Sequence, residues 1–141
     1  MLVGFNEHLY HYRLVLFIIE SVIMKPGATG IKRVIDAAGY SVQGLKAAWI
    51  NEAAFRQELV LLVVLTVVTF FLPVTKFEQL AMVASMFLVL IVELINSAIE
   101  AVVDRIGSEH HELSGRAKDI GSAAVFVSMC FVAITWLVIL L

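Results

Sequence analysis

Cysteine is almost absent from this sequence, since Cys130 is the single example among 141 residues. One cysteine excludes an intrachain disulfide and a thiolate metal cluster. Charge is also scarce, because Asp, Glu, Lys and Arg make up 16% of the chain and the net charge is −2. That balance gives no sign of a nucleic-acid-binding surface. Apolar residues are abundant instead, at 61% with a mean hydropathy of +0.96, which is typical of an integral membrane protein.

Long, mostly apolar runs occur three times, at about residues 51–72, 79–103 and 120–141. The purely apolar part of the first run is only 59–72, so Glu58 and the polar residues just before it are expected to lie at or just inside one interface. A membrane-spanning helix needs about 20 mostly apolar residues. A polar loop over 104–119 precedes the third run. Ahead of the first run, apolar residues at helical spacing over 31–49 predict an amphipathic helix that lies in the membrane interface. The sequence therefore predicts an all-α membrane protein with three transmembrane helices and one interfacial helix.

The membrane domain is expected to occupy residues 30–141 and leaves little chain for anything outside the bilayer. A polar site among so few helices needs further walls, which favours an oligomer. Residues 1–29 are expected to form an N-terminal extension. Its apolar segment 14–24 is too short to span, and it has neither the basic start nor the cleavage pattern of a secretory signal. Because a flexible polar stretch follows Met24, we expect native translation to start there and residues 1–23 to be non-native; intact-mass measurement tests this.

The distribution of basic residues predicts the orientation in the membrane. Nine of the ten Lys and Arg residues fall on one side of the expected spans, and Lys76 falls on the other. Basic residues concentrate on the cytoplasmic side of membrane proteins. We therefore expect the N-terminus and the 104–119 loop to be cytoplasmic and the C-terminus to be periplasmic.

An acidic stripe runs along the second expected span, where residues 93–104 read ELINSAIEAVVD. A carboxylate in hydrocarbon costs roughly 2.5–3.5 kcal/mol on insertion scales, so it is rarely there without a use. At 100° per residue the polar side chains lie within an arc of about 100° and a length of roughly 16 Å. The opposite side is apolar, so the stripe is expected to face protein or a wet cleft. The stripe consists of Glu93, Asn96, Ser97, Glu100 and Asp104.

This pattern suits phosphoryl transfer at the cytoplasmic interface, near which Glu52, Glu100 and Asp104 are expected to lie. Mg²⁺ commonly takes one or two protein carboxylates and completes its shell with water and phosphate. Nearby basic residues would offset phosphate charge. The deeper Glu93 would accept a proton from a hydroxyl that arrives from the lipid side. The basic residues concerned are Arg33, Arg116 and Lys118.

These features together indicate transfer of a phosphoryl group from Mg·ATP to a lipid alcohol. The sequence has neither the GxxxxGK(S/T) nucleotide-binding motif nor the HRD and DFG motifs of protein kinases. From spacing alone, a proton-coupled transporter that uses Glu93 as its proton carrier stays open.

Two segments resemble the prokaryotic diacylglycerol kinases, a family of small integral membrane kinases. They are AAGYSVQGLKAAWINEAAFRQE at 37–58 and ELINSAIEAVVDRIGSEHHELSGRAKDIGSAAV at 93–125. The resemblance covers about residues 30–141. It implies a homotrimer in the bacterial inner membrane, with three spans and an interfacial helix per subunit and active sites composed of residues from neighbouring subunits.

The resemblance also implies roles for individual residues. Glu93 would be the general base and Asn96 would support it, while Glu52 and Glu100 would hold the Mg²⁺ that bridges the ATP phosphates. His110 departs from the family pattern, which has a tyrosine at that position. The residues implied in ATP binding are Arg33, Tyr40, Glu52, Glu100, Glu109, His110, His111, Lys118 and Asp119. The residues implied in binding the lipid substrate are Arg33, Ala37, Ala38, Trp49, Gln57, Glu93 and Ser122.

The activity that follows is ATP-dependent phosphorylation of 1,2-diacylglycerol to phosphatidic acid. Undecaprenol kinase, an activity of the Gram-positive branch of the family, is the alternative. The segment AAWINEAAFRQE at 47–58 is similar to the Gram-negative branch and favours diacylglycerol.

Overall fold

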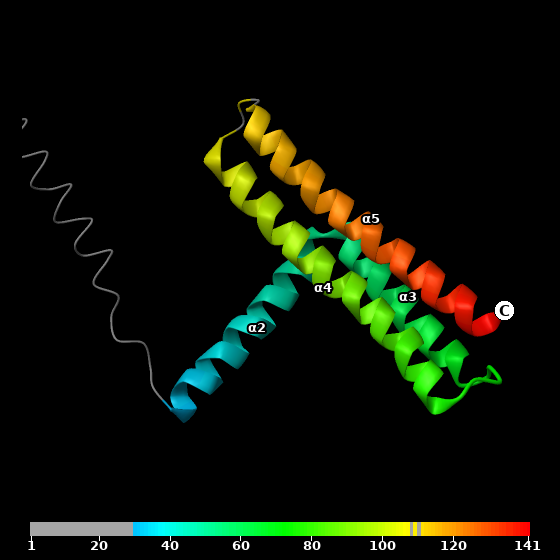
Figure 1. Ribbon diagram of the computed structural model, residues 1–141. Coiled ribbons are helices and arrows are strands. Elements are labelled where there is room, and N and C mark those ends of the chain that lie inside the picture. The colour runs from blue at the N-terminus through cyan, green and yellow to red at the C-terminus, as the bar shows by residue number, and fades with distance from the viewer. Residues whose placement is uncertain (1–29, 108, 110) are drawn as a thin grey trace, which may run out of the picture. The chain divides into compact units, whose positions relative to one another are not determined.

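The computed structural model describes residues 30–107, 109 and 111–141. Within these residues the chain forms four α-helices and no strand (Figure 1). The all-α class predicted from the sequence is therefore confirmed. The expected N-terminal extension and the start at Met24 lie outside the described residues. The helices are α2 (Ile31–Asn51), α3 (Ala53–Thr69), α4 (Lys76–Ile106) and α5 (Glu112–Leu140).

The chain divides into two compact units, Met1–Val42 and Gln43–Leu141. The described part of the first unit belongs to α2 and is exposed except at the half-buried Asp36. The second unit holds the last part of α2 and the whole of α3, α4 and α5. All of the buried side chains named below belong to the second unit.

Two of the described helices, α4 and α5, are long and apolar enough to cross a membrane. The third helix of that unit, α3, has 17 residues, which corresponds to about 26 Å at the helical rise. That length is at the lower limit for a span. The third transmembrane helix and the interfacial position of α2 therefore stay predictions.

The polar loop expected over 104–119 is shorter in the structure, and this part of the prediction is wrong. Helix α4 continues to Ile106, and α5 begins at Glu112. The N-cap of α5 is His111, whose Nδ1 accepts a hydrogen bond from the Leu113 backbone N–H at 3.2 Å. Because a side-chain acceptor satisfies a free N–H of the first turn, the helix begins within the polar stretch.

The start of α4 is fixed by a capping box between Thr75 and Glu78. The Thr75 hydroxyl oxygen accepts from the Glu78 N–H at 3.3 Å, and the Thr75 N–H donates to Glu78 Oε2 at 2.8 Å. These reciprocal bonds satisfy donors that a helix N-terminus leaves free. The backbone hydrogen bond from Thr75 is the main reason that the pKa of Glu78, in the polar first turn, is lowered.

The junction between α2 and α3 lies at Glu52, whose extended backbone (φ −106°, ψ 110°) separates the two helices. The Arg56 side chain crosses this junction. Its Nη1 donates to the carbonyl oxygens of Trp49 at 2.8 Å and Ile50 at 3.2 Å. Since the last carbonyls of a helix have no partner within it, Arg56 stabilises the end of α2 and fixes the backbone on both sides of Glu52.

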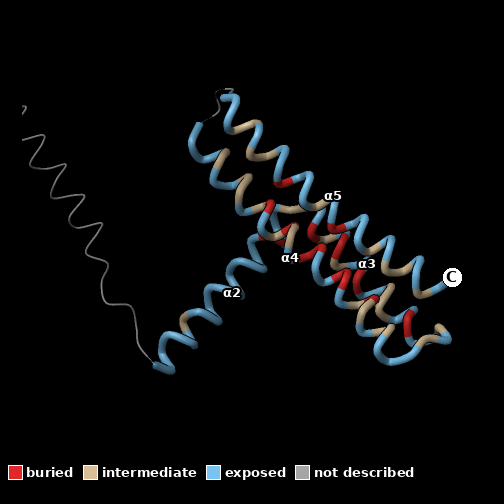
Figure 2. The backbone as a smooth tube through the Cα atoms, in the orientation of Figure 1, coloured by how far each residue is buried: buried red, intermediate tan, exposed pale blue. Residues whose placement is uncertain are grey.

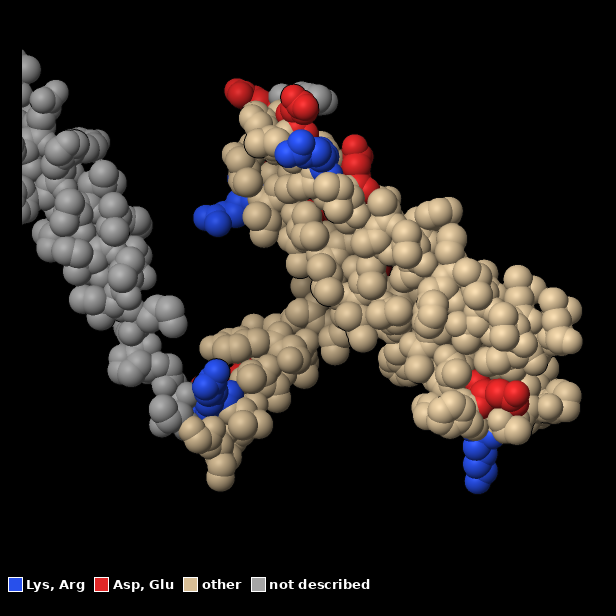
Figure 3. Space-filling view, viewed as in Figure 1, with Lys and Arg blue, Asp and Glu red and all other residues tan. Residues whose placement is uncertain are grey.

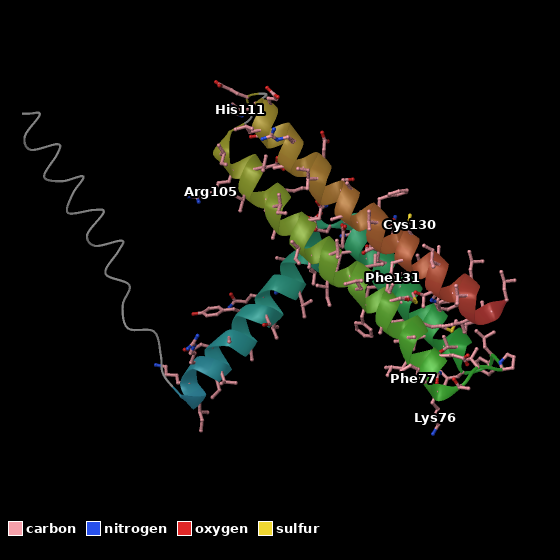
Figure 4. All side chains as sticks on the ribbon, viewed as in Figure 1. Lys76, Phe77, Arg105, His111, Cys130 and Phe131 are labelled. Carbon is pink, nitrogen blue, oxygen red and sulfur yellow. The ribbon has the colours of Figure 1, made fainter. Side chains whose placement is uncertain are left out.

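The core of the second unit is formed by the end of α2 together with α3 and α4, and the partly buried Val132 and Trp136 of α5 pack against it. Figure 2 shows the buried positions gathered there. Helices α4 and α5 run side by side (Figure 1). The polar ends of this pair are marked by Lys76 at one end and by Arg105 and His111 at the other (Figure 4). The buried cluster consists of Ala48, Phe55, Leu62, Met86 and Leu90.

The outer surface of α4 and α5 is apolar, and Figure 3 shows charged residues near the ends of these helices with few between them. Phe126 and Val127 are exposed on α5, as are Ile91 and Ile95 on α4. Large contiguous apolar surfaces are rare on proteins that face water. The surface is instead that of a helical protein whose side chains face lipid.

Candidate active site

A polar cavity of about 320 Å³ lies among α3, α4 and α5. It brings together five residues for which the sequence predicted a role. The junction before α3 contributes Glu52, helix α4 contributes Glu93, Asn96 and Glu100, and α5 contributes Ser122. The complete lining consists of Glu52, Ala54, Glu58, Glu93, Asn96, Glu100, Ser122, Val125 and Met129.

The acidic stripe of α4 faces into the protein over part of its length. Glu93 is 5% exposed and Asn96 is 9% exposed, whereas Glu100 is half-buried and Asp104 is exposed. Exposure therefore increases from Glu93 towards the polar end of α4. Glu93 and Glu100 are seven residues apart, which is about 10 Å along the helix.

Asn96 connects the middle of the stripe to Glu100. Its Nδ2 donates a hydrogen bond to Glu100 Oε1 at 3.0 Å. Its Oδ1 is buried and has no hydrogen-bond partner among the described residues. The bond fixes the orientation of the Glu100 carboxylate and leaves the second Glu100 oxygen free to bind another group.

Glu58 lines the same cavity, although the sequence prediction gave it no role beyond a position at or just inside the interface. It lies on α3 and is 9% exposed, and within the part of the chain that the structure describes its Oε2 has no hydrogen-bond partner. The signal for its burial is its place directly before the apolar run 59–72. Helical periodicity along α4 could not reveal it, because Glu58 reaches the cavity through packing of α3 against α4.

An apolar cavity of about 190 Å³ adjoins the polar one, and Glu58 and Met129 line both. Its other walls come from α3, α4 and α5 and are Leu61, Leu65, Met86, Val89 and Val132. Glu58 therefore lies where the polar, carboxylate-lined cavity and the apolar cavity meet. Such a junction suits a ligand with a polar group and a hydrocarbon part.

At the polar end of the α4–α5 pair, Lys118 and Asp104 form an ion pair with 2.7 Å between Nζ and Oδ1. Lys118 lies ahead of the apolar run that begins at Ile120. The hydrogen bond to Asp104 is the main reason that the pKa of Lys118 is raised. Neither residue lines the polar cavity. The charge of Glu100 also contributes to the raised pKa of Lys118, so this predicted ATP-binding lysine lies within electrostatic reach of a predicted metal ligand.

Several other predicted site residues of the second unit do not line the cavity in the described part of the chain. Trp49 and Gln57 are exposed and do not line it, and neither do the exposed Glu109, His111 and Asp119. His110 lies outside the described residues. The predicted residues on the first unit form their own group on α2: Arg33, Ala37, Ala38 and Tyr40.

The donors in the cavity are carboxylate and amide oxygens, which are hard ligands of the kind that Mg²⁺ prefers. Among the described residues, no group of three or more His, Cys, Asp or Glu side chains is placed to hold a metal ion by itself. A pair of carboxylates supplies fewer ligands than an octahedral ion takes. This is compatible with Mg²⁺, which commonly keeps water and substrate phosphate in its shell.

Comparison with known proteins identifies the family. The sequence pattern of the family "Prokaryotic diacylglycerol kinase" matches residues 39–140. The chain is 56% identical over 117 residues to Diacylglycerol kinase of Escherichia coli (strain K12), an alignment that covers 83% of this chain and 96% of the relative. It is 54% identical over 115 residues to Diacylglycerol kinase of Pseudomonas aeruginosa, covering 82% and 94%. For Diacylglycerol kinase of Haemophilus influenzae the identity is 56%, covering 77% and 92%.

The apolar helices and the acidic cavity define the class of this molecule, which is a helical membrane protein with a polar site among its helices. The matches then give the family: the chain belongs to the prokaryotic diacylglycerol kinases. It is therefore a bacterial membrane enzyme and a lipid kinase.

Proposed function

We propose that this enzyme transfers the γ-phosphoryl group of ATP to the free hydroxyl of 1,2-diacylglycerol and forms phosphatidic acid and ADP. The observation that carries the proposal is the cavity in which Glu52, Glu93, Asn96 and Glu100 meet among apolar helices. The relatives' names support diacylglycerol as the lipid. The adjoining apolar cavity supports a substrate with a hydrocarbon part.

In this proposal Glu93 is the general base. The diacylglycerol hydroxyl oxygen forms a bond to the γ-phosphorus while the bond from that phosphorus to the bridging β–γ oxygen breaks. The hydroxyl proton passes to the Glu93 carboxylate, and ADP leaves. The burial of Glu93 supports this role, because it shields the carboxylate from bulk water. A lipid hydroxyl would reach it from the bilayer.

Glu52 and Glu100 would hold Mg²⁺, with the remaining coordination positions left to water and phosphate. When bound, Mg²⁺ would neutralise charge on the ATP phosphates. Asn96 holds the Glu100 carboxylate through its hydrogen bond, and Arg56 holds the backbone around Glu52. The chain's own contribution is therefore mainly the positioning of charged groups.

The proposal extends to the ATP contacts. Lys118 offers a cation at the polar end of the α4–α5 pair, where ATP would arrive from the cytoplasm. Arg33, Tyr40, Glu109, His110, His111 and Asp119 complete the proposed set. The lipid substrate would contact Arg33, Ala37, Ala38, Trp49, Gln57 and Ser122 in addition to Glu93.

The proposed assembly is a homotrimer in the bacterial inner membrane with sites shared between subunits. Each subunit would contribute α3 as a third span and α2 as an interfacial helix, with the N-terminus cytoplasmic and the C-terminus periplasmic. The support for a shared site is that a polar cavity bounded by so few helices of one chain needs further residues to enclose it. The predominance of basic residues on one side of the spans supports the orientation.

The test is an assay of the purified full-length protein in mixed detergent micelles with radiolabelled ATP and one lipid at a time. We expect rapid Mg²⁺-dependent labelling of 1,2-diacylglycerol and slow labelling of undecaprenol. A strong preference for undecaprenol would replace the proposed substrate. ATP-independent proton flux in vesicles without lipid phosphorylation would replace the proposed reaction with transport.

A further inference from the structure

Gly121 lies on α5 directly opposite Asn96 of α4, and it is buried. A β-carbon at this position would overlap Asn96 Oδ1 and would lie 3.3 Å from Asn96 Cγ. The amide of Asn96 therefore occupies the space that a side chain at position 121 would need. Gly115, an earlier glycine of the same helix, has no atom within 4 Å of the corresponding point. The requirement for glycine is thus specific to position 121.

The contact with Gly121 bears on Glu100 through the Asn96 amide. The Asn96 nitrogen donates to Glu100 Oε1 at 3.0 Å, while its oxygen packs against Gly121 without a hydrogen-bond partner. A rotation of the amide by 180° would place its oxygen against a carboxylate oxygen, and two acceptors repel each other. A side chain at position 121 would displace the amide from this position. The orientation of Glu100 therefore depends on the missing side chain of Gly121.

We propose that Gly121 is a positioning residue for the metal site and acts through Asn96 on the Glu100 carboxylate. This inference rests on the proposed role of Glu100 as a metal ligand. Residues that orient a metal ligand commonly change metal affinity by on the order of 10- to 100-fold when they are replaced. A methyl group at position 121 would weaken metal binding while leaving the apolar cavity unchanged, because Gly121 does not line it.

The experiment measures Mn²⁺ binding to the purified protein by electron paramagnetic resonance, in the presence of a non-hydrolysable ATP analogue. We expect Gly121→Ala to weaken Mn²⁺ binding by on the order of 10-fold or more. Gly115→Ala is the matched control and should bind as the wild type does. The Mg²⁺ concentration needed for half-maximal activity should rise in Gly121→Ala and stay at the wild-type value in Gly115→Ala. Equal Mn²⁺ affinity in Gly121→Ala and Gly115→Ala would overturn the inference.

A double variant separates positioning from a loss of folding. Asn96→Ala removes the amide and frees the space, so Asn96→Ala/Gly121→Ala should fold and should bind Mn²⁺ no more weakly than Asn96→Ala alone. Additive losses would show that Gly121 does not act through Asn96. Glu100→Gln separates the proposed role of Glu100 as a metal ligand from the proposed positioning role of Gly121. If Glu100→Gln leaves Mn²⁺ affinity unchanged, the proposed metal site fails; if it weakens affinity while Gly121→Ala does not, this inference alone fails.

Discussion

Glu100 is the residue at which the proposed metal chemistry and the local structure meet. One of its oxygens accepts from Asn96, and it lines the same cavity as Glu52. A glutamine at position 100 would keep the shape of the side chain and remove its charge. The hydrogen bond with Asn96 would survive, because the glutamine oxygen still accepts.

We therefore predict that Glu100→Gln raises the Mg²⁺ concentration needed for half-maximal activity by on the order of 10-fold or more, since a neutral amide is a weaker ligand of a hard cation. Titration of activity with Mg²⁺ at saturating diacylglycerol measures this. Glu78→Gln is the control, because Glu78 lies in the first turn of α4 and outside the cavity. An unchanged Mg²⁺ requirement in Glu100→Gln would exclude Glu100 as a ligand.

At the scale of the helix, α4 carries Glu93, Asn96 and Glu100 of the candidate site, and it begins at the capping box of Thr75 and Glu78. The pKa of Glu78 is lowered, mainly by the hydrogen bond from the Thr75 backbone. A carboxylate with a lowered pKa in the folded state adds stability that is present above its unfolded pKa and is lost as the pH falls through its folded pKa. The contribution of this cap should therefore disappear in acid.

We predict that the thermal stability advantage of the wild type over Glu78→Gln is present at neutral pH. The advantage should shrink as the pH falls below about 4.5, the ordinary pKa of a glutamate. Thermal unfolding in detergent across this pH range, followed by circular dichroism, measures the difference. A constant difference between the two proteins at all pH values would show that the Glu78 charge does not contribute to the cap.

Helix positions could be predicted well from the sequence, but their ends could not. The long, mostly apolar runs at 79–103 and 120–141 lie within or close to α4 and α5, because a helix that crosses a membrane needs about 20 mostly apolar residues. Periodic apolar residues show where a helix is buried, yet they give no signal in polar turns. Backbone hydrogen bonding carries α4 to Ile106, and the cap at His111 begins α5 at Glu112.

The site was predictable to the extent that it lies on one helix. Spacing alone placed Glu93, Asn96 and Glu100 on one face of α4, and the structure has all three on the polar cavity. The expected spans placed Glu52 near the same membrane interface as Glu100, but only the family resemblance implied that the two residues share one metal site, because the place of Glu52 depends on how α3 packs against α4. The same packing brings in Glu58, for which the sequence had suggested no function.

At the scale of the whole molecule, the proposed homotrimer would complete each site with residues of a neighbouring subunit. Lys118 does not line the polar cavity of its own chain. If Lys118 instead contributes to the polar cavity of a neighbouring subunit, a subunit that lacks Glu93 and a subunit that lacks Lys118 would complement each other.

We therefore predict that mixing unfolded Glu93→Gln and Lys118→Met subunits and refolding them together restores part of the activity. Some of the mixed trimers would contain one site with both residues intact. Phosphatidic acid formation, measured as a function of the mixing ratio, reports the recovery, and each variant refolded alone is the control. Mixtures that stay inactive at every ratio would contradict shared sites.

We propose that the phosphoryl group is transferred in the acidic cavity among α3, α4 and α5, with Glu93 as the base. The most direct measurement compares the wild type with Glu93→Gln in the formation of phosphatidic acid from diacylglycerol, at matched occupancy of Mg·ATP. We expect Glu93→Gln to retain nucleotide binding and its turnover to fall by on the order of 100-fold or more, which is the usual contribution of a general base. Turnover of Glu93→Gln at the wild-type rate would contradict it.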